Sequence, residues 1–302
     1  MFNFRYLSHI FLFCLIFSAC ALSNGPQNIS SSDQEATGYP LNPIPVGAQE
    51  ELNWMPSNGW DIFSPTSSER LEMEKDPEAY RAVKNRSLSV WSEKNVSVDT
   101  MSLFLSKCLT QDKCRANDRE HEYLAGELTS ERPYESGRLQ ATFQAVKGSG
   151  VVTSMFVYRK SEGEVLNEID IEVLGKDPTE VHLTYWVDGK SYGKVLGGDI
   201  LGSNFDAASQ AHHYAFEWDY QRIAWYIDNK CVYYVEKNNT DPFISHPMYI
   251  ILNLWISNSG ETWAGDVNND TLFPTDDTTY TVNYKDLKFY PVVAPASNEF
   301  NR

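Results

Sequence analysis

Three carboxylates at alternate positions, Glu168, Asp170 and Glu172, have the types and spacing in this chain that best suit chemistry. In a β-strand successive side chains point to opposite faces, so the three would share one face and Ile169 and Ile171 the other. Neighbouring carboxylates repel each other, and burial adds a desolvation cost. Hydrolysis of a glycosidic bond uses two carboxyl groups that flank the scissile bond. The pattern therefore indicates a glycosidase site, with a solvated strand face as the alternative.

Composition narrows the class of substrate. The chain has Trp 8, Tyr 17 and Phe 15 among 302 residues, and aromatic rings offer platforms for the apolar C–H faces of sugars. The net charge of −16 disfavours nucleic acid, since phosphate repels an acidic chain. There is also no basic patch for an anionic polysaccharide. No zinc-site spacing, P-loop or GxGxxG motif occurs in the sequence. A neutral carbohydrate is the expected partner.

Residues 167–177 (NEIDIEVLGKD) resemble the active-site strand of glycoside hydrolase family 16. Within the family they most resemble the lichenases, bacterial endo-β-1,3-1,4-glucanases with a jelly-roll fold. Lichenases and plant xyloglucan-modifying enzymes share the spacing Glu-x-Asp-x-Glu, whereas laminarinases and agarases usually carry one extra residue before the last Glu. The resemblance extends over about residues 126–291 and includes residues 126–127 (GE), 150–154 (GVVTS), 212–218 (HHYAFEW), 253–255 (NLW) and 263–265 (WAG).

This resemblance implies a role for each carboxylate of the strand. Glu168 takes the position of the nucleophile, and Glu172 that of the general acid/base of a retaining double displacement. Asp170 would hydrogen-bond the nucleophile and tune the pKa values of both. Neighbouring carboxylates raise the pKa of Glu172, as a general acid requires.

The resemblance also implies a set of substrate-binding residues. Tyr185 and Trp186 face opposite ways on their strand, so only one of them can line the cleft. Lichenases have an aromatic residue at the position of Trp186, so the resemblance favours Trp186. Core packing is the alternative role for Trp255 and Trp263, and a surface position on a strand is the alternative for Glu127. The expected set is Glu127, Trp186, Asn253, Trp255 and Trp263.

Several positions differ from the lichenase pattern. Leu166 stands where the family usually has Trp, Asn167 where it commonly has Asp, and Thr129 and Thr184 where lichenases have Arg and Asn. These differences leave strict mixed-linkage specificity open. Lichenases also bind a structural calcium through backbone carbonyls and an Asp at the position of Lys285. Calcium therefore remains an alternative, while catalysis requires no cofactor.

The start of the chain predicts export. Residues 1–20 combine Arg5 with a short apolar run over residues 10–17, as in a signal peptide. Ser18-Ala19-Cys20 resembles the end of a bacterial lipobox, which would make Cys20 a lipidated N-terminus on the cell envelope. Cleavage near Ala19 or Ala21, with release of a secreted protein, is the alternative. A flexible tether over 21–47, a catalytic domain over 48–293 and a tail over 294–302 complete the expected organisation.

Short runs bounded by turn residues predict an all-β fold. About a dozen strands are expected, in a jelly-roll β-sandwich of two packed antiparallel sheets with a concave substrate cleft. Asp228-Asn229 predicts a hairpin, and a capping box at Thr66 predicts a helix-like insertion over residues 66–84. The expected strands cover residues 96–98, 101–105, 137–146, 151–158, 169–174, 181–187, 214–218, 223–227, 231–235, 248–255 and 280–290.

Three further cysteines fit an exported protein. A disulfide between Cys108 and Cys114 is expected in an oxidising compartment, and Cys231 is expected to be a buried, inert thiol.

The function expected from the sequence is a monomeric, retaining endo-β-glucanase that cleaves β-1,4 bonds in mixed-linkage β-1,3-1,4-glucan. One alternative is hydrolysis or transglycosylation of xyloglucan or another β-glucan. The other is a non-catalytic glucan-binding surface lipoprotein, although intact Glu168, Asp170 and Glu172 weigh against it.

Overall fold

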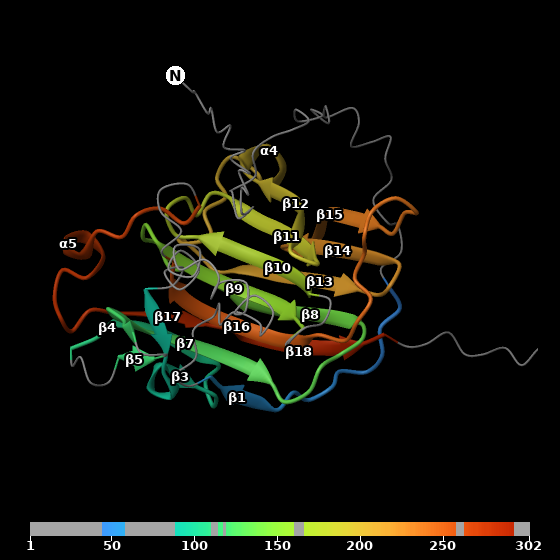
Figure 1. The fold of residues 1–302 in the computed structure, drawn as a ribbon. Helices are drawn as coiled ribbons and strands as arrows, with labels where there is room; N and C mark the ends of the chain where they lie inside the picture. The colour runs from blue at the N-terminus through green and yellow to red at the C-terminus, as the bar shows by residue number, and fades with distance from the viewer. Residues whose placement is uncertain are drawn as a thin grey trace, which may run out of the picture. The chain divides into compact units, whose positions relative to one another are not determined.

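Two packed β-sheets form most of the structure, which confirms the predicted all-β sandwich (Figure 1). The computed structural model describes residues 44–57, 88–109, 114–116, 119–159, 166–257 and 263–292. The predictions of a signal peptide, a lipidated Cys20, a tether up to residue 43, an insertion over 66–84 and a tail over 294–302 fall outside these residues. Among those described, no helix is long and apolar enough to cross a membrane.

The larger sheet has eleven strands. Strands β1 (Trp54–Pro56) and β2 (Ser89–Trp91) pair with β7, and β3 (Val96–Ser97) pairs with β4. The main order is β12 (Lys190–Leu196), β11 (Val181–Val187), β10 (Asn167–Leu174), β9 (Val151–Tyr158), β16 (Tyr249–Ile256), β7 (Tyr123–Ser130), β4 (Ser102–Lys107) and β17 (Thr279–Asn283).

The smaller sheet has five strands, and a two-stranded ribbon of β5 (Arg115–Ala116) and β6 (Arg119–Glu120) lies apart from both sheets in the pairing. The order of the five is β15 (Lys230–Glu236), β14 (Arg222–Ile227), β13 (His212–Trp218), β8 (Gly137–Phe143) and β18 (Lys285–Pro291). The short helices are η1 (Glu93–Asn95), α4 (Gly198–Leu201) and α5 (Asn269–Leu272).

Period-2 alternation builds the core between the sheets. On β10, Ile169 and Ile171 are fully buried in a cluster with Phe216 and Trp218 of the smaller sheet. Glu168, Asp170 and Glu172 alternate with these two isoleucines, so their side chains point to the outer face of the larger sheet. We call this side of the larger sheet the carboxylate face.

Two hairpins follow from their turn residues. Asp228 and Asn229 have φ of 49° and 65°, so the predicted hairpin between β14 and β15 is confirmed. Asp188 and Gly189, with φ of 51° and 77°, make a second hairpin that leads into β12, a strand not expected from the sequence. Its two lysines and its glycine have low strand propensity, and it is held as an edge strand by its pairing with β11.

The single strand expected over residues 280–290 is wrong. The segment divides at the buried Tyr284 into β17, in the larger sheet, and β18, in the smaller one. The Tyr284 hydroxyl donates to the backbone oxygens of Ser154 (2.7 Å) and Asn253 (3.2 Å). The chain changes sheets here because this side chain reaches between the layers.

Residues 44–57 form a segment that we call the N-terminal strap. Its first part lies along β18, where the amides of Gly47 and Glu50 donate to the oxygens of Pro291 (2.6 Å) and Phe289 (2.8 Å). Its last part is β1, which pairs with β7 of the other sheet. Ile44, within the segment expected to be a tether, is buried. The strap therefore joins an edge of each sheet.

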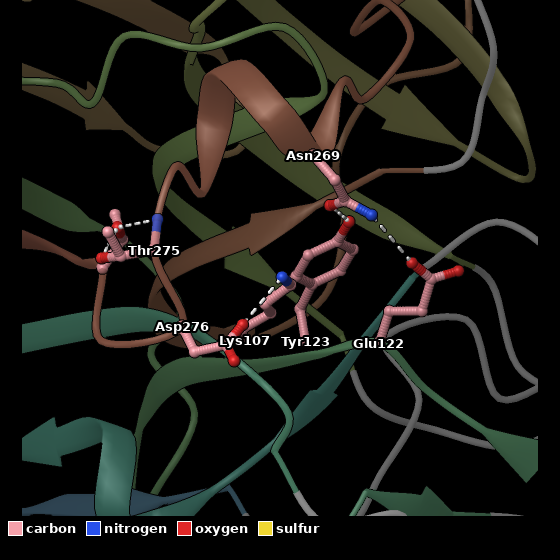
Figure 2. A network of polar contacts seen from close by, with 7 residues as sticks. Lys107, Glu122, Tyr123, Asn269, Thr275 and Asp276 are labelled. Atoms are coloured by element: carbon pink, nitrogen blue, oxygen red, sulfur yellow. Dashed lines mark hydrogen bonds and ion pairs between the residues drawn. The ribbon is translucent and has the colours of Figure 1, made fainter.

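The remaining cysteines and one polar network also bear on the predictions. Cys108 and Cys114 are joined in a disulfide with Cα atoms 6.2 Å apart. Cys231 is half-buried rather than fully buried, and it lies next to a register shift between β14 and β15. Figure 2 shows that Tyr123 donates to Asn269, whose amide donates to Glu122 (3.4 Å) and so ties α5 to the start of β7.

Candidate active site

The carboxylate face is organised around β10, which is hydrogen-bonded to a neighbouring strand on each side. Glu168, Asp170 and Glu172 all lie on this face. Glu168 and Glu172 are half-buried, and Asp170 is 3% exposed. A slip of one residue would turn all three into the apolar core. The double pairing therefore fixes which face the carboxylates occupy.

Each carboxylate has a cross-strand neighbour on β11. Trp186 lies opposite Glu168, Thr184 opposite Asp170, and His182 opposite Glu172. Tyr185 points into the interior, where its ring stacks on Tyr192. The register thus puts Trp186, and not Tyr185, on the side of the carboxylates.

Several hydrogen bonds hold Asp170, the middle one of the three carboxylates. The Thr184 hydroxyl donates to its Oδ2 (2.6 Å), and the carboxyl also hydrogen-bonds the side chains of Glu168 and Trp186. From the opposite layer, the indole Nε1–H of Trp225 donates to the backbone oxygen of Asp170 (2.9 Å). Both the side chain and the backbone of Asp170 are therefore held in place.

Burial raises the pKa of all three carboxyls. The pKa of Asp170 rises from 3.8 to about 7, against the opposing effect of its hydrogen bonds from Thr184, Glu168 and Trp186. Burial raises the pKa of Glu168 well above its usual value, and the charges of Asp170 and Glu172 add to this effect. Burial and then the charge of Asp170 raise that of Glu172. Near neutral pH the group therefore retains protons, and such a site can hold an acid beside a base.

A second polar row crosses four strands beside Glu172. Ser154 lies opposite Glu172, Asn253 opposite Ser154, and Glu127 opposite Asn253. The Ser154 hydroxyl donates to Asn253, and the Asn253 amide contacts Oε2 of Glu127 at 3.5 Å. The hydroxyl of Ser57, in the N-terminal strap, donates to Oε1 of Glu127 (2.6 Å).

This row contains two of the expected substrate-binding residues, Glu127 and Asn253. Their exposed fractions are 6% and 2%, so each presents little surface. Trp255 lies further along the same face of β16, and its ring centroid is 6.1 Å from that of Trp263. Trp255 is 3% exposed and belongs to the core cluster, whereas Trp263 is half-buried at its edge. The stacking roles of both tryptophans stay predictions.

Two residues of the site were not expected from the sequence. His182 alternates with Thr184 and Trp186 along β11, and this period-2 pattern is the signal that could have found it. Burial and the charge of Lys176 lower the pKa of His182 to about 4, so its imidazole is neutral beside Glu172. Ser57 is 70 residues from Glu127, and no local pattern indicates their contact.

The expected calcium position has Lys285 in place of the lichenase Asp. Lys285 and Asp286 are both exposed, and Asp286 has a φ of 50° at the irregular start of β18. Among the described residues, no group of three or more His, Cys, Asp or Glu side chains could hold a metal ion. The residues present at this position therefore do not supply the expected carboxylate ligand.

Comparisons with known proteins agree with this geometry. The family model described as Glycosyl hydrolases family 16 matches residues 83–284. The chain is 34% identical over 151 residues to a beta-glucanase of Paenibacillus polymyxa, which covers 49% of this chain and 59% of that protein. It is 30% identical over 184 residues to a xylanase/beta-glucanase of Ruminococcus flavefaciens, covering 60% of this chain and 22% of that protein. The chain thus spans less than two thirds of the length of either relative.

Solved structures show the same fold. A Bacillus licheniformis beta-glucanase aligns with a TM-score of 0.58 and 26% identity, covering 82% of this chain and 96% of that one. The laminarinase catalytic domain of Thermotoga maritima aligns with a TM-score of 0.61 over 84% of this chain and 100% of that one. At 18% identity, the second likeness concerns the fold alone.

Proposed function

The chain belongs to the glycosyl hydrolases family 16, and on this premise we propose that it is a retaining endo-β-glucanase of mixed-linkage β-1,3-1,4-glucan, cleaving β-1,4 bonds. One observation carries the proposal: Glu168 and Glu172 share the face of one strand, with the buried Asp170 between them. The relatives described as beta-glucanases support the substrate class.

The proposed reaction has two displacements. The Glu168 carboxylate attacks the anomeric carbon, the glycosidic C–O bond breaks, and Glu172 gives its proton to the leaving oxygen. A water then loses a proton to Glu172 and attacks the same carbon, which releases Glu168 with net retention. The raised pKa of Glu172 suits the acid of the first step.

The distance between the two glutamates is compatible with this chemistry. Four residues of strand separate their Cα atoms by about 13 Å. Retaining enzymes need a carboxyl separation of about 5–5.5 Å, so the two long side chains must lean towards each other along the face.

The neighbouring residues supply binding groups for the glucan. Trp186, opposite Glu168, offers an aromatic surface for a sugar ring next to the nucleophile. Glu127 and Asn253 are oriented by the hydrogen bonds of the second row, and from these positions they would bind sugar hydroxyls. Export as a lipoprotein anchored at Cys20 would place the enzyme where it meets a polysaccharide.

A role limited to glucan binding accounts less well for the site. Burial of three adjacent carboxyls raises the pKa of each, which costs stability at neutral pH. A binding surface gains nothing from that cost, whereas acid–base chemistry requires shifted pKa values.

The test is release of reducing ends from mixed-linkage β-glucan by residues 23–302, compared with Glu168→Gln. We expect activity in the wild type and its loss in the variant by at least about 10³-fold. Glu236→Gln, at an exposed position at the end of β15, is the matched control and should keep full activity.

A folded wild type that releases nothing from this glucan would exclude the proposed substrate. Xyloglucan and laminarin are the next substrates, and release from either would assign the alternative β-glucan. If all three stayed intact while one of them bound, the chain would be a glucan-binding protein.

A further inference from the structure

Thr184 has no step of its own in the proposed reaction, yet it contacts the centre of the carboxylate group. We propose that Thr184 is a positioning residue that fixes the orientation of the Asp170 carboxyl, and thereby the proton that Asp170 shares with Glu168. The effect of Thr184 on catalysis rests on the proposed function, whereas its hydrogen bond with Asp170 is independent of that function.

The first argument is the geometry of the contact. Thr184 lies directly opposite Asp170 in the register, and its hydroxyl donates to Oδ2 at 2.6 Å. Asp170 is almost inaccessible to water, so a lost protein donor would not be readily replaced.

The second argument is the rigidity of Thr184. Its β-branched side chain has few rotamers. On its other side lies Gly193 of β12, which has a φ of +140°. A Cβ at Gly193 would stand 2.2 Å from the oxygen of Leu183 and 2.7 Å from the Cα of Thr184. The backbone of β12 thus approaches Thr184 very closely and restricts its movement.

The third argument is what the contact does to the carboxyl. A hydroxyl that donates to Oδ2 makes this oxygen an acceptor, so a proton held by Asp170 lies on Oδ1. Asp170 also hydrogen-bonds the Glu168 side chain. When Asp170 is the donor in that contact, Glu168 is ionised, as a nucleophile must be. Thr184 therefore determines which oxygen of Asp170 can carry the shared proton, and its hydrogen bond lowers the pKa of Asp170.

The titratable neighbours of Asp170 are few among the described residues. Glu168 and Glu172 lie on its own strand, His182 on β11 and Tyr158 on β9. From β12, the residues on this face are Ser191, Gly193 and Val195, which carry no charge. A change in the titration of Asp170 after substitution of Thr184 can therefore be read against a short set of groups.

The experiment is a ¹³C NMR titration of the Asp170 carboxyl in the wild type, Thr184→Val and Thr184→Ser, with the resonance assigned by its loss in Asp170→Asn. Valine keeps the shape of threonine and removes the donor to the ionised form. We expect the titration midpoint to rise by about one pH unit or more in Thr184→Val. Thr184→Ser should return it to within a few tenths of a unit, and Thr281→Val, at an exposed position on β17, should leave it unchanged.

Activity on mixed-linkage glucan provides the second readout. Thr184→Val should lower kcat by about tenfold with little change in KM, and should move the alkaline limb of the pH profile upward. Serine should restore both. An unchanged Asp170 midpoint in Thr184→Val would overturn the inference, as would a midpoint that serine fails to restore. If valine prevents folding, Thr184→Ala takes its place under the same criteria.

The two readouts separate this inference from the proposed function. A shifted midpoint in a protein that cleaves no glucan would support the positioning by Thr184 and reject the glucanase. Glucan cleavage together with an unshifted Asp170 midpoint would support the glucanase and reject the positioning by Thr184.

Discussion

The indole of Trp225 donates a hydrogen bond of 2.9 Å to the backbone oxygen of Asp170, and so connects the smaller sheet to the middle of β10. Tyr284 makes a similar contact with the backbone oxygens of Ser154 and Asn253, beneath the second polar row. Two buried aromatic donors thus hold the carboxylate face from its inner side. The strands of the candidate site are fixed by the packing of the two layers as well as by their hydrogen-bond ladders.

Tyr284→Phe tests this support. The variant keeps the ring and removes one hydroxyl, which leaves two buried backbone oxygens without this donor. We expect a loss of about 1–2 kcal/mol in the free energy of unfolding, measured by urea denaturation. Tyr290→Phe, at a half-buried position on β18, is the control and should change stability by less than about 0.5 kcal/mol. Equal effects of both substitutions would contradict the prediction.

Glu172→Gln tests the proposed division of roles between Glu172 as the acid and Glu168 as the nucleophile. Without a proton donor, cleavage of glucan should fall by about 10²–10⁴-fold. A dinitrophenyl β-glycoside of a glucan oligosaccharide has a leaving group that needs no proton, so the variant should still release dinitrophenol in a rapid burst. Glu168→Gln should release none. A variant at Glu172 that loses both reactions would be inconsistent with the assigned role.

Stability should fall as pH rises through the range in which Asp170 titrates. The folded pKa of about 7 lies above the ordinary value of 3.8. Between these values the folded state binds more protons than the unfolded state, so the free energy of unfolding decreases with increasing pH. Asp170→Asn should reduce this decrease and make the protein more stable than the wild type at pH 8. Urea denaturation at pH 5 and pH 8 measures both effects, and parallel pH dependences in the two proteins would refute them.

Ser57→Ala tests whether the N-terminal strap orients Glu127. The variant removes the hydroxyl that donates to Oε1 of Glu127 and leaves the strap's backbone pairing with β7 intact. If Glu127 binds sugar hydroxyls, KM for mixed-linkage glucan should rise about fivefold with kcat nearly unchanged. Ser203→Ala, at an exposed position beyond α4, serves as the control. A KM equal to that of the wild type in Ser57→Ala would show that Ser57 does not orient Glu127 for binding.

The sequence predicted those features that depend on local pattern. Alternation around Ile169 and Ile171 placed the three carboxylates on one face, and Asp228-Asn229 marked a hairpin. The limits of β9 and β11 also agree with the expected strands, because turn residues bound both runs.

The remaining features depend on contacts between distant segments. Tyr284 interrupts an apparent strand because its hydroxyl reaches the carbonyls of Ser154 and Asn253, 130 and 31 residues away. The contact of Ile44 with Glu217 joins residues 173 apart in the sequence. Such contacts are set by how the two sheets stack, and no periodicity in a single segment records them.

The N-terminal strap also has a mechanical consequence. A pulling force applied to the chain before residue 44 would first load the contacts of Ile44 with Glu217, and then the hydrogen bonds of Gly47 and Glu50 along β18. These bonds lie along the edge of the smaller sheet, ahead of β1 and Ser57. Under such a force the strap would therefore separate from β18 first, while β1 stayed paired with β7 and Ser57 stayed hydrogen-bonded to Glu127.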